Sequence, residues 1–424
     1  MKIFFLWVVL IIFMSGNGFA SPMQGMGIKQ YNTRVSAFAP LPRFIENRIS
    51  DFSVGHPFTK QSAAGTVTND TTTHLNGTQS FKITTDGDNV AVTARSGLLS
   101  PTLDFTGQEL VLQINTDAIE VMNEITVYMT SDNFAADFYI FPFDDPSTNF
   151  IKNGDWVTLT MNFSDASITG SPNRAAINNI QLRIRDNGSQ VANVNFASIG
   201  MTPEPSAGLL TFAFDDGWVS QYDEAKKKLS ENGFPATAYV IKDNIGLSGF
   251  LTLNQMHELE NLHGWEMATH HGTDLTTVGL ADAETLIKQE KQWLIDNGFN
   301  RGADHFAIPN GAFNQSLLDL FRKYFRTARG IAGTAETFPP ADWHRLRIFN
   351  VLNTTTATAI ANAVDDARTN NTWLILLFHK IVASPTVSTE YSITNFGTVV
   401  DDIATDGIAV KTISQAIIDG LGTL

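Results

Sequence analysis

A proline-rich linker, called the joint below, divides this sequence into two stretches that differ in the periodicity of their hydrophobic residues. The joint is Thr202-Pro203-Glu204-Pro205-Ser206-Ala207-Gly208. After the joint, short apolar runs alternate with longer stretches whose apolar residues recur at helical spacing. Alternation of this kind produces a parallel sheet covered by helices, and about eight repeats favour a β/α barrel over an open sheet. We therefore expect a distorted β/α barrel over residues 204–424. Its expected strands are 209–215, 236–241, 265–270, 305–309, 327–331, 345–349, 373–379 and 408–413.

Before the joint, residues 45–203 show short alternating runs that are broken by turn residues, and convincing helices are almost absent. The run Ser80–Thr85 ends at Asp86-Gly87, and the run Gln181–Arg185 ends at Asp186-Asn187-Gly188. Threonine, valine, isoleucine and phenylalanine are frequent in these runs. This spacing predicts an all-β, jelly-roll-like sandwich.

The first 20 residues have the pattern of a signal peptide. Lys2 supplies a positive start, Ile3–Met14 is apolar, and Gly18 and Ala20 occupy the small positions of a cleavage site. We expect cleavage and a secreted or periplasmic protein, the alternative being an uncleaved anchor. No later segment is apolar enough to span a bilayer. Residues 21–44 are expected to form a linker or arm.

Charge and cysteine content exclude several classes of function. The chain carries 28 basic and 43 acidic side chains, a net charge of −15, which disfavours nucleic acids and anionic membranes as partners. Neutral or cationic polymers remain compatible with this charge. Because the sequence contains no cysteine, a bound metal would need histidine, aspartate or glutamate ligands.

Polar residues follow three of the expected barrel strands. Asp215 and Asp216 end the first strand, His270 ends the third with Asp274 four residues later, and His379 ends the seventh. Separately, each has an ordinary explanation, such as a capping aspartate in a turn or a surface imidazole beside a loop. Because active sites of such barrels form at the C-terminal ends of the strands, we expect these residues to meet in a metal site with acid and base partners.

Four segments in this order resemble the motifs of polysaccharide deacetylases, the NodB homology domain of carbohydrate esterase family 4. Phe214-Asp215-Asp216-Gly217 resembles the first motif, T-F-D-D-G, and Leu377-Phe378-His379 resembles the last, L-x-H. The two middle segments, 266–274 and 306–311, resemble the second and third motifs less well. The resemblance covers just over half of the chain.

This resemblance implies a role for each matching residue. Asp215 would be the general base, Asp216 and His270 would bind a divalent metal, most simply Zn²⁺, and His379 would be the general acid. Asp274 stands where the family has its second metal-binding histidine, so we expect it to be the third ligand.

A shortened loop that brings in His271 instead is the alternative for that ligand. The backbone N–H of Asn310 would bind the oxyanion, Leu377 would pack near the acetyl methyl group, and Trp343 would form a wall of the acetyl groove. Asp342, before Trp343, corresponds to a family residue that steadies the acid histidine. An ordinary capping aspartate and a packed tryptophan are the alternative for this pair.

The arginine of the third motif is replaced by Ala307. Another group must therefore orient Asp215, and Arg329 and Arg347 on later strands are the candidates.

The expected function is an exported, metal-dependent deacetylase of acetylated polysaccharides, first of N-acetylated amino-sugar polymers. An O-acetyl esterase of xylan-like or algal polysaccharide, a catalytically silent carbohydrate-binding protein, and a matrix-adhesion module are the alternatives. The sandwich would either bind carbohydrate or pack against the barrel to shape its cleft. Trp156, its one tryptophan, is expected in the core rather than in a sugar platform.

Overall fold

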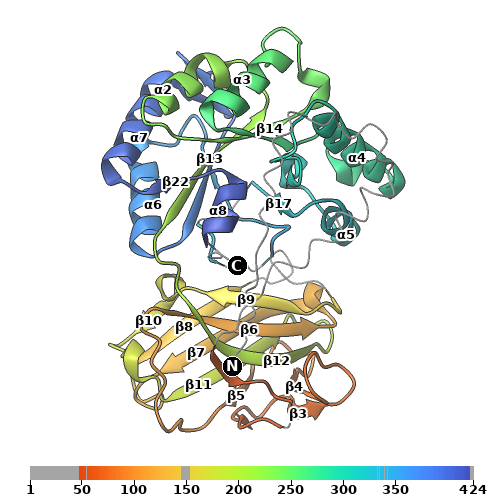
Figure 1. The fold of residues 1–424 in the computed structure, drawn as a ribbon. Coiled ribbons are helices and arrows are strands. Elements are labelled where there is room, and N and C mark those ends of the chain that lie inside the picture. The colour runs from red at the N-terminus through yellow and green to blue at the C-terminus, as the bar shows by residue number, and fades with distance from the viewer. Residues whose placement is uncertain are drawn as a thin grey trace, which may run out of the picture.

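The computed structural model describes residues 47–53, 55–144, 153–331, 333, 335–338, 340 and 342–420. The expected signal peptide and linker, residues 1–20 and 21–44, lie outside these residues. Figure 1 shows two units, one built mainly of strands and one in which helices surround a sheet.

The first unit consists of two antiparallel sheets. One has the order β3-β4-β12-β6-β9 with β1 beside β12, and the other has the order β10-β8-β7-β11-β5-β2. The strands are β1 (Asn47–Ser50), β2 (Thr59–Lys60), β3 (Thr66–Asp70), β4 (Ser80–Thr84), β5 (Val92–Arg95), β6 (Gln108–Thr116), β7 (Met122–Thr130), β8 (Phe138–Asp144), β9 (Val157–Met161), β10 (Ser167–Thr169), β11 (Asn179–Asp186) and β12 (Asn193–Pro203). The expected all-β unit is present, whereas its jelly-roll connectivity stays a prediction.

Alternation along the strands gives this unit its core. Ile180, Leu182 and Ile184 of β11 are buried in one hydrophobic cluster with residues of the facing sheet, such as Leu112 and Phe196. The residues between them on β11 point to the opposite side, because successive side chains of a strand alternate between the two faces.

The second unit contains a parallel sheet in the order β17-β16-β15-β14-β13-β19-β18, with β22 paired to the start of β13. Its strands are β13 (Leu209–Asp216), β14 (Thr237–Val240), β15 (Glu266–Thr269), β16 (His305–Ala307), β17 (Thr327–Arg329), β18 (Phe349–Asn350), β19 (Trp373–Phe378) and β22 (Ala409–Val410), besides a small parallel pair, β20 (Lys380–Val382) and β21 (Glu390–Ser392). The α-helices are α2 (Lys226–Ser230), α3 (Leu253–His263), α4 (Leu280–Asp296), α5 (Gln315–Tyr324), α6 (Ala357–Thr369), α7 (Ile393–Asp406) and α8 (Ile413–Gly420).

The sheet curls so that its two edges are linked. Leu346 forms a parallel bridge with Arg329 at the end of β17, and three residues later Phe349 of β18 pairs with Leu376 of β19. The expected distorted barrel is thus a curled parallel sheet, and its eighth strand is β22, at the start of β13.

Each barrel strand has an inner and an outer face. Ala213, Tyr239, Ala268, Ala307 and Leu377 are buried together in one cluster on the inner face. Their neighbours along the strands, such as Phe212 and Phe378, are buried in a second cluster with residues of the surrounding helices. Every second residue of a strand therefore points into the barrel. This alternation determines which side chains at the strand ends face the barrel mouth.

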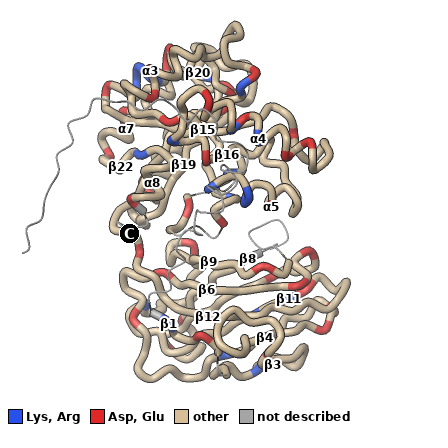
Figure 2. Tube along the Cα trace, turned by 45° about the vertical axis from the view of Figure 1, so that its right-hand side comes forward, with Lys and Arg blue, Asp and Glu red and all other residues tan. Residues whose placement is uncertain are grey.

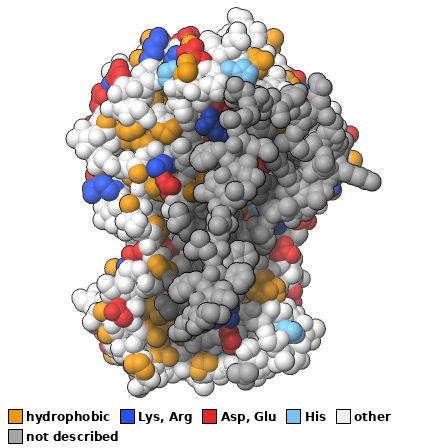
Figure 3. Space-filling view, viewed as in Figure 1, with side chains coloured by type: hydrophobic (Ala, Val, Ile, Leu, Met, Phe, Trp, Pro, Cys, Tyr) orange, Lys and Arg blue, Asp and Glu red, His pale blue; other side chains and the backbone are white. Residues whose placement is uncertain are grey.

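The two units contact each other at the N-terminal ends of the barrel strands. Asn162, just after β9, donates a hydrogen bond to the carbonyl oxygen of Asn370, which precedes β19, at 3.0 Å. Arg322, at the end of α5, lies 3.8 Å from Asp155. In Figure 3 the outline narrows at this junction on its left-hand side, and the tube in Figure 2 marks positions of acidic residues in red on both units.

In the part of the chain that the structure describes, the helices are too short or too polar to cross a bilayer.

Candidate functional site

The end of β13 presents two carboxylates in one direction. Asp215 follows the inward-facing Ala213 by two residues and is 3% exposed. Asp216 would point outward, but its backbone φ is +72° and that of Gly217 is +75°. Two consecutive left-handed residues turn the chain sharply, and aspartate tolerates this conformation better than most residues. Asp216 is therefore brought back toward the barrel mouth.

Arg329 holds the Asp215 carboxylate. Its guanidinium group donates a hydrogen bond to Oδ1 of Asp215, and its side chain is fully buried. The guanidinium carbon also lies 4.5 Å from the centre of the Tyr239 ring. Of the two arginines expected as candidates, Arg329 takes this position, whereas Arg347 pairs with Glu336.

The strand register explains how Arg329 reaches Asp215. Arg329 on β17 is the direct register partner of Ala307 on β16, so both side chains point into the barrel. Ala307 is the position at which the family motif has its arginine. The small alanine leaves space across which the longer side chain of its neighbour reaches the carboxylate.

His270 faces Asp216 across the barrel mouth. It lies two residues beyond the inward-facing Ala268, and its Nε2 is 3.6 Å from Oδ1 of Asp216. Burial would lower the pKa of His270, but the carboxylates of Asp215 and Asp216 raise it above its usual value. Burial would raise the pKa of Asp216, but the contact with His270 lowers it below its usual value.

His379 completes this group of side chains from the end of β19. It follows the inward-facing Leu377 by two residues, and its Nε2 is 3.8 Å from Oδ2 of Asp215. At this distance the two atoms do not share a direct hydrogen bond. Both are consequently available to a reactant in the barrel mouth.

Gln221 ties together the strand ends that carry Asp215 and His379. It is fully buried in a π-helix (Gln221–Ala225), and its Nε2 donates to the carbonyl oxygens of Asp215, at 2.6 Å, and His379, at 3.3 Å. Trp218 supports Asp216 in turn, because its Nε1 donates to Oδ2 of that residue at 3.0 Å. Neither residue was predicted from the sequence. Their closeness in sequence to Asp215 was the only signal available.

The expected third metal ligand does not join this group. Oδ1 of Asp274 accepts hydrogen bonds from the backbone and the hydroxyl of Thr276, at 2.9 and 2.6 Å, and caps a short 3₁₀-helix. The alternative, His271, has the opposite parity to His270 and points outward, where its Nε2 lies 3.9 Å from the buried Glu290 of α4. Among the described residues, no three acidic or histidine side chains are placed to hold one metal ion.

Asp216 and His270 nevertheless have the geometry of two ligands of one metal. Nδ1 of His270 lies 2.9 Å from the carbonyl oxygen of Ala307. A proton on Nδ1 bound to that carbonyl leaves Nε2 with a lone pair directed at the Asp216 carboxylate, as in metal-binding histidines. Zinc–ligand bonds of about 2.0–2.2 Å in a tetrahedral site separate neighbouring ligand atoms by roughly 3.4 Å, close to the separation here.

The residues expected to contact the substrate are placed as follows. Asn310 is exposed and left-handed, with φ of +54°, in a short turn after β16. Leu377 is fully buried in the inner cluster of the barrel, and Trp343 is 7% exposed in the same cluster.

Asp342 pairs with Arg322 at 3.0 Å and accepts a hydrogen bond from the backbone of His344. These contacts of Asp342 match the capping alternative, and Nδ1 of His379 is buried without a hydrogen-bond partner.

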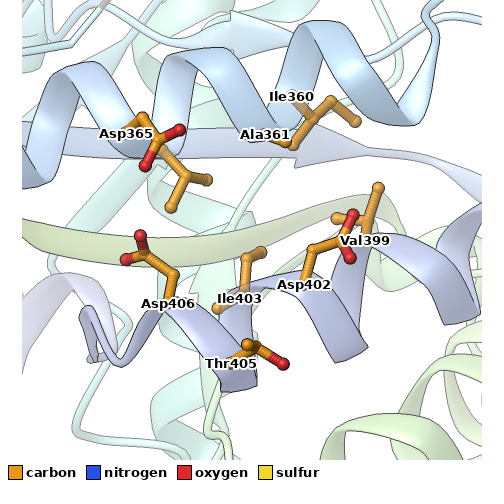
Figure 4. A pocket seen from close by; sticks show the side chains of 9 residues that line it. Ile360, Ala361, Asp365, Val399, Asp402, Ile403, Thr405 and Asp406 are labelled. Carbon is orange, nitrogen blue, oxygen red and sulfur yellow. The ribbon is translucent and has the colours of Figure 1, made fainter.

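A surface groove on the outside of the barrel is separate from this site. It lies between α6 and α7, with Ile360, Val399 and Ile403 inside and Asp365, Asp402 and Asp406 along it (Figure 4). Arg368 pairs with Asp365 and Asp406. The groove holds none of the residues at the strand ends.

Residues 202–327 match the family model described as polysaccharide deacetylase. The first part of the barrel unit is therefore similar to polysaccharide deacetylases. This match begins at the joint and includes Asp215, Asp216, His270, Ala307 and Asn310, whereas Arg329 and His379 lie beyond it.

A Bacillus subtilis (strain 168) protein, YxkH, provisionally named a polysaccharide deacetylase, is 29% identical over 143 residues. The aligned part is 33% of this chain and 51% of YxkH, so this chain spans about half the length of that relative.

Three solved structures show partial likeness. The Xyl-CE4 domain of a multidomain xylanase from the hindgut metagenome of Trinervitermes trinervoides has a TM-score of 0.37, 16% identity, and coverage of 50% of this chain and 89% of the other. The family 4 carbohydrate esterase from Streptomyces lividans, in complex with acetate, has a TM-score of 0.35, 19% identity, and coverage of 49% and 94%. The Streptococcus pyogenes deacetylase PplD, in complex with acetate, has a TM-score of 0.30, 24% identity, and coverage of 33% and 64%.

Proposed function

We propose that this chain is an exported, zinc-dependent deacetylase that hydrolyses the N-acetyl groups of an amino-sugar polymer. The observation that carries the proposal is the meeting of Asp215, Asp216, His270 and His379 at the barrel mouth, from three different strands. A structural role alone does not require two carboxylates and two imidazoles at one strand edge, because such groups are costly to bury together.

Asp215 is proposed as the general base. Arg329 occupies Oδ1 of its carboxylate and leaves Oδ2 directed toward the barrel mouth. Oδ2 accepts a proton from the attacking water as the water oxygen bonds to the acetyl carbon. The fixed orientation of the carboxylate keeps this atom in place during the reaction.

His379 is proposed as the general acid. In its protonated form it donates a proton from Nε2 to the amide nitrogen, the carbon–nitrogen bond breaks, and acetate and the free amine leave. The proton taken up by Asp215 balances the one given by His379, so a proton exchange with solvent restores both residues. The short 3.8 Å separation of the two groups suits a base and an acid that act on the same acetyl group.

Asp216 and His270 would hold the zinc ion, which when bound supplies a Lewis acid for water and for the acetyl carbonyl. Trp218 and the carbonyl of Ala307 orient these two side chains. The backbone N–H of Asn310 is proposed as an oxyanion donor, with Leu377 near the methyl group, whereas Trp343 is packed in the barrel interior. Further coordination positions would be filled by water or substrate.

Acetate release tests this proposal and names the substrate class. The purified chain with added zinc would be given chitin oligosaccharides, a β-1,6-N-acetylglucosamine polymer, peptidoglycan and acetylxylan. Release from an amino-sugar polymer is the expected result. Release from acetylxylan alone would replace the proposal with an O-acetyl esterase, and no release from any polymer together with no bound zinc would favour a silent binding protein.

A further inference from the structure

The outer face of the second sheet carries a set of long polar and aromatic side chains that the deacetylase site does not use. On β11 and β7 the inward residues, such as Leu182 and Val127, are buried in the core, so the alternate residues point outward. We call these outward residues, with Arg95 of β5, Phe138 of β8 and Phe134 of the loop before β8, the arginine face. Its members are Arg95, Glu124, Tyr128, Phe134, Phe138, Gln181, Arg183 and Arg185.

Positive charge exceeds negative charge among these side chains. Nε of Arg183 and Nε of Arg185 lie 3.2 and 3.3 Å from the Glu124 carboxylate. The two arginine side chains are 33% and 37% exposed, whereas the glutamate side chain beneath them is 8% exposed. The guanidinium groups are therefore exposed to solvent, and the buried carboxylate of Glu124 pairs with them from below. Together with Arg95, the arginine face carries three positive side chains and one negative side chain, although the whole protein has a net charge of −15.

Arg95 is held at the other end of the face. Its Nε donates to Oε1 of Gln181 at 2.8 Å, and its guanidinium carbon lies 4.2 Å from the centre of the Phe134 ring. Phe134 adopts a left-handed φ of +64°, which is unfavourable for a bulky side chain. Strain of this kind is retained where the surrounding structure enforces it, often at binding sites. Here it brings an aromatic ring beside the arginine.

Aromatic rings continue across the face from Phe134. The ring centres of Phe134 and Phe138 are 6.2 Å apart, and those of Phe138 and Tyr128 are 6.1 Å apart. Nη1 of Arg183 donates to the Tyr128 hydroxyl at 3.0 Å. The arginine face thus combines partly exposed rings with guanidinium groups that retain unused N–H donors.

We propose that the arginine face binds an acidic polysaccharide, whose carboxylates pair with the guanidinium groups while its sugar rings pack on Tyr128 and Phe138. Guanidinium groups match carboxylates in shape and hydrogen-bonding geometry, and aromatic rings offer a flat apolar surface to the C–H faces of sugars. Neighbouring strands are about 4.8 Å apart and alternate residues about 6.8 Å apart. The cations are therefore closely spaced, which favours a polymer with a carboxylate on every ring.

This surface belongs to a different part of the molecule from the proposed active site. The sandwich contacts the barrel through Asn370 and Arg322, at the N-terminal ends of the strands, whereas Asp215 and His379 lie at the C-terminal ends. The arginine face would accordingly anchor the protein to a matrix, and the bound polymer need not be the substrate. The expectation that the sandwich shapes the cleft does not agree with this arrangement.

Affinity electrophoresis of the full-length protein tests the proposal. Native gels would contain polygalacturonate as the acidic probe, and parallel gels would contain neutral hydroxyethylcellulose. We expect polygalacturonate to slow the wild-type chain and 0.5 M NaCl to remove most of the effect, because salt at this concentration screens exposed charges. The double variant R95Q/R183Q should bind at least tenfold more weakly, and Tyr128→Ala should weaken binding while leaving the charges in place.

Lys82→Gln is the matched control, because Lys82 lies on the other sheet and pairs with Asp70 at 3.0 Å. Each variant should keep the thermal unfolding midpoint of a folded sandwich. Unchanged migration of the wild type in polygalacturonate would overturn the proposal. So would equal, salt-independent retardation by the neutral polymer, or wild-type binding by R95Q/R183Q. Because binding is read without acetate release, this result is independent of the proposed deacetylation.

Discussion

At the scale of single residues, the most informative feature is that the guanidinium group beside Asp215 comes from β17 and not from β16. A buried carboxylate that loses its cation loses its fixed orientation, and a misplaced catalytic group can cost about 100-fold in rate. We predict that Arg329→Ala lowers kcat by about 100-fold or more, with a smaller effect on KM. Because Ala307 and Arg329 are register partners, adding Ala307→Arg to this variant should restore part of kcat.

Arg347→Ala is the control for that prediction. Arg347 also binds a buried carboxylate, that of Glu336, but it precedes β18, away from the strand ends that carry the site. Its removal should lower the thermal midpoint and leave kcat of the folded enzyme unchanged. Equal loss of kcat in the two single variants would mean that Arg329 acts only through stability.

The metal ligands give a second prediction at this scale. Asp216 and His270 face each other, whereas the Asp274 carboxylate is used as a helix cap. We expect His270→Ala to lose zinc, measured as metal content after dialysis, and Asp274→Ala to retain it. Because two protein ligands bind zinc less tightly than the usual three, a chelator should strip the wild type readily. Loss of zinc from the Asp274→Ala variant would restore the third-ligand interpretation.

At the scale of the elements, the π-helix after β13 has a positioning role. Gln221 donates to the backbone carbonyls of Asp215 and His379 and so fixes the distance between β13 and β19 at their ends. Gln221→Ala removes both hydrogen bonds, and we predict a fall in kcat of about tenfold or more. Gln292→Ala, at a half-buried glutamine of α4 that bonds to Asp296, should leave kcat unchanged.

The strand parities explain why much of the site could be predicted from the sequence. Asp215, His270 and His379 each lie two residues beyond an inward-facing residue of an apolar strand, a period that is visible in the sequence. The choice between Arg329 and Arg347 required the register of β17 against β16, which no local pattern encodes. The position of Asp274 likewise depends on local backbone conformation, because a four-residue spacing brings two side chains together only if the chain is helical there; in the structure Asp274 caps a 3₁₀-helix.

At the scale of the whole molecule, one buried acid lies at the contact between the two units. Glu109 of β6 accepts a hydrogen bond from Asn162, which in turn donates to Asn370 of the barrel. Burial raises the pKa of Glu109 to about 8, the Asn162 bond opposes this rise, and nearby Glu204 and Asp165 add to it.

A pKa that is higher in the folded state than in the unfolded chain makes stability fall as the pH rises between the two values. In the unfolded chain the pKa of Glu109 is its ordinary value of 4.5, so the loss runs from about pH 4.5 to about pH 8, by at most roughly 1.4 kcal/mol per unit. Glu109→Gln should unfold at a higher temperature than the wild type at pH 8.5 and equally at pH 4.5. Glu120→Gln on the sandwich surface is the control. If the difference in unfolding temperature between Glu109→Gln and the wild type is the same at pH 4.5 and pH 8.5, the prediction is contradicted.

The architecture was predictable at this scale, whereas the relation of the units was not. Alternation of strands and helices follows from hydrophobic period, so the sheets on either side of the joint could be expected. Which end of the barrel meets the sandwich depends on long-range contacts such as that between Asn162 and Asn370. The arginine face depends likewise on cross-strand register, which brings Arg95, Gln181 and Tyr128 into one row.

The most direct test of the account is acetate release by Asp215→Asn beside Asp274→Asn, with zinc, on the polymer that the wild type deacetylates best. The two substitutions are chemically identical, and they differ only in whether the aspartate faces the barrel mouth. The account predicts that Asp215→Asn loses at least about 100-fold in kcat while keeping bound zinc, and that Asp274→Asn keeps both. Wild-type acetate release by Asp215→Asn would contradict the account.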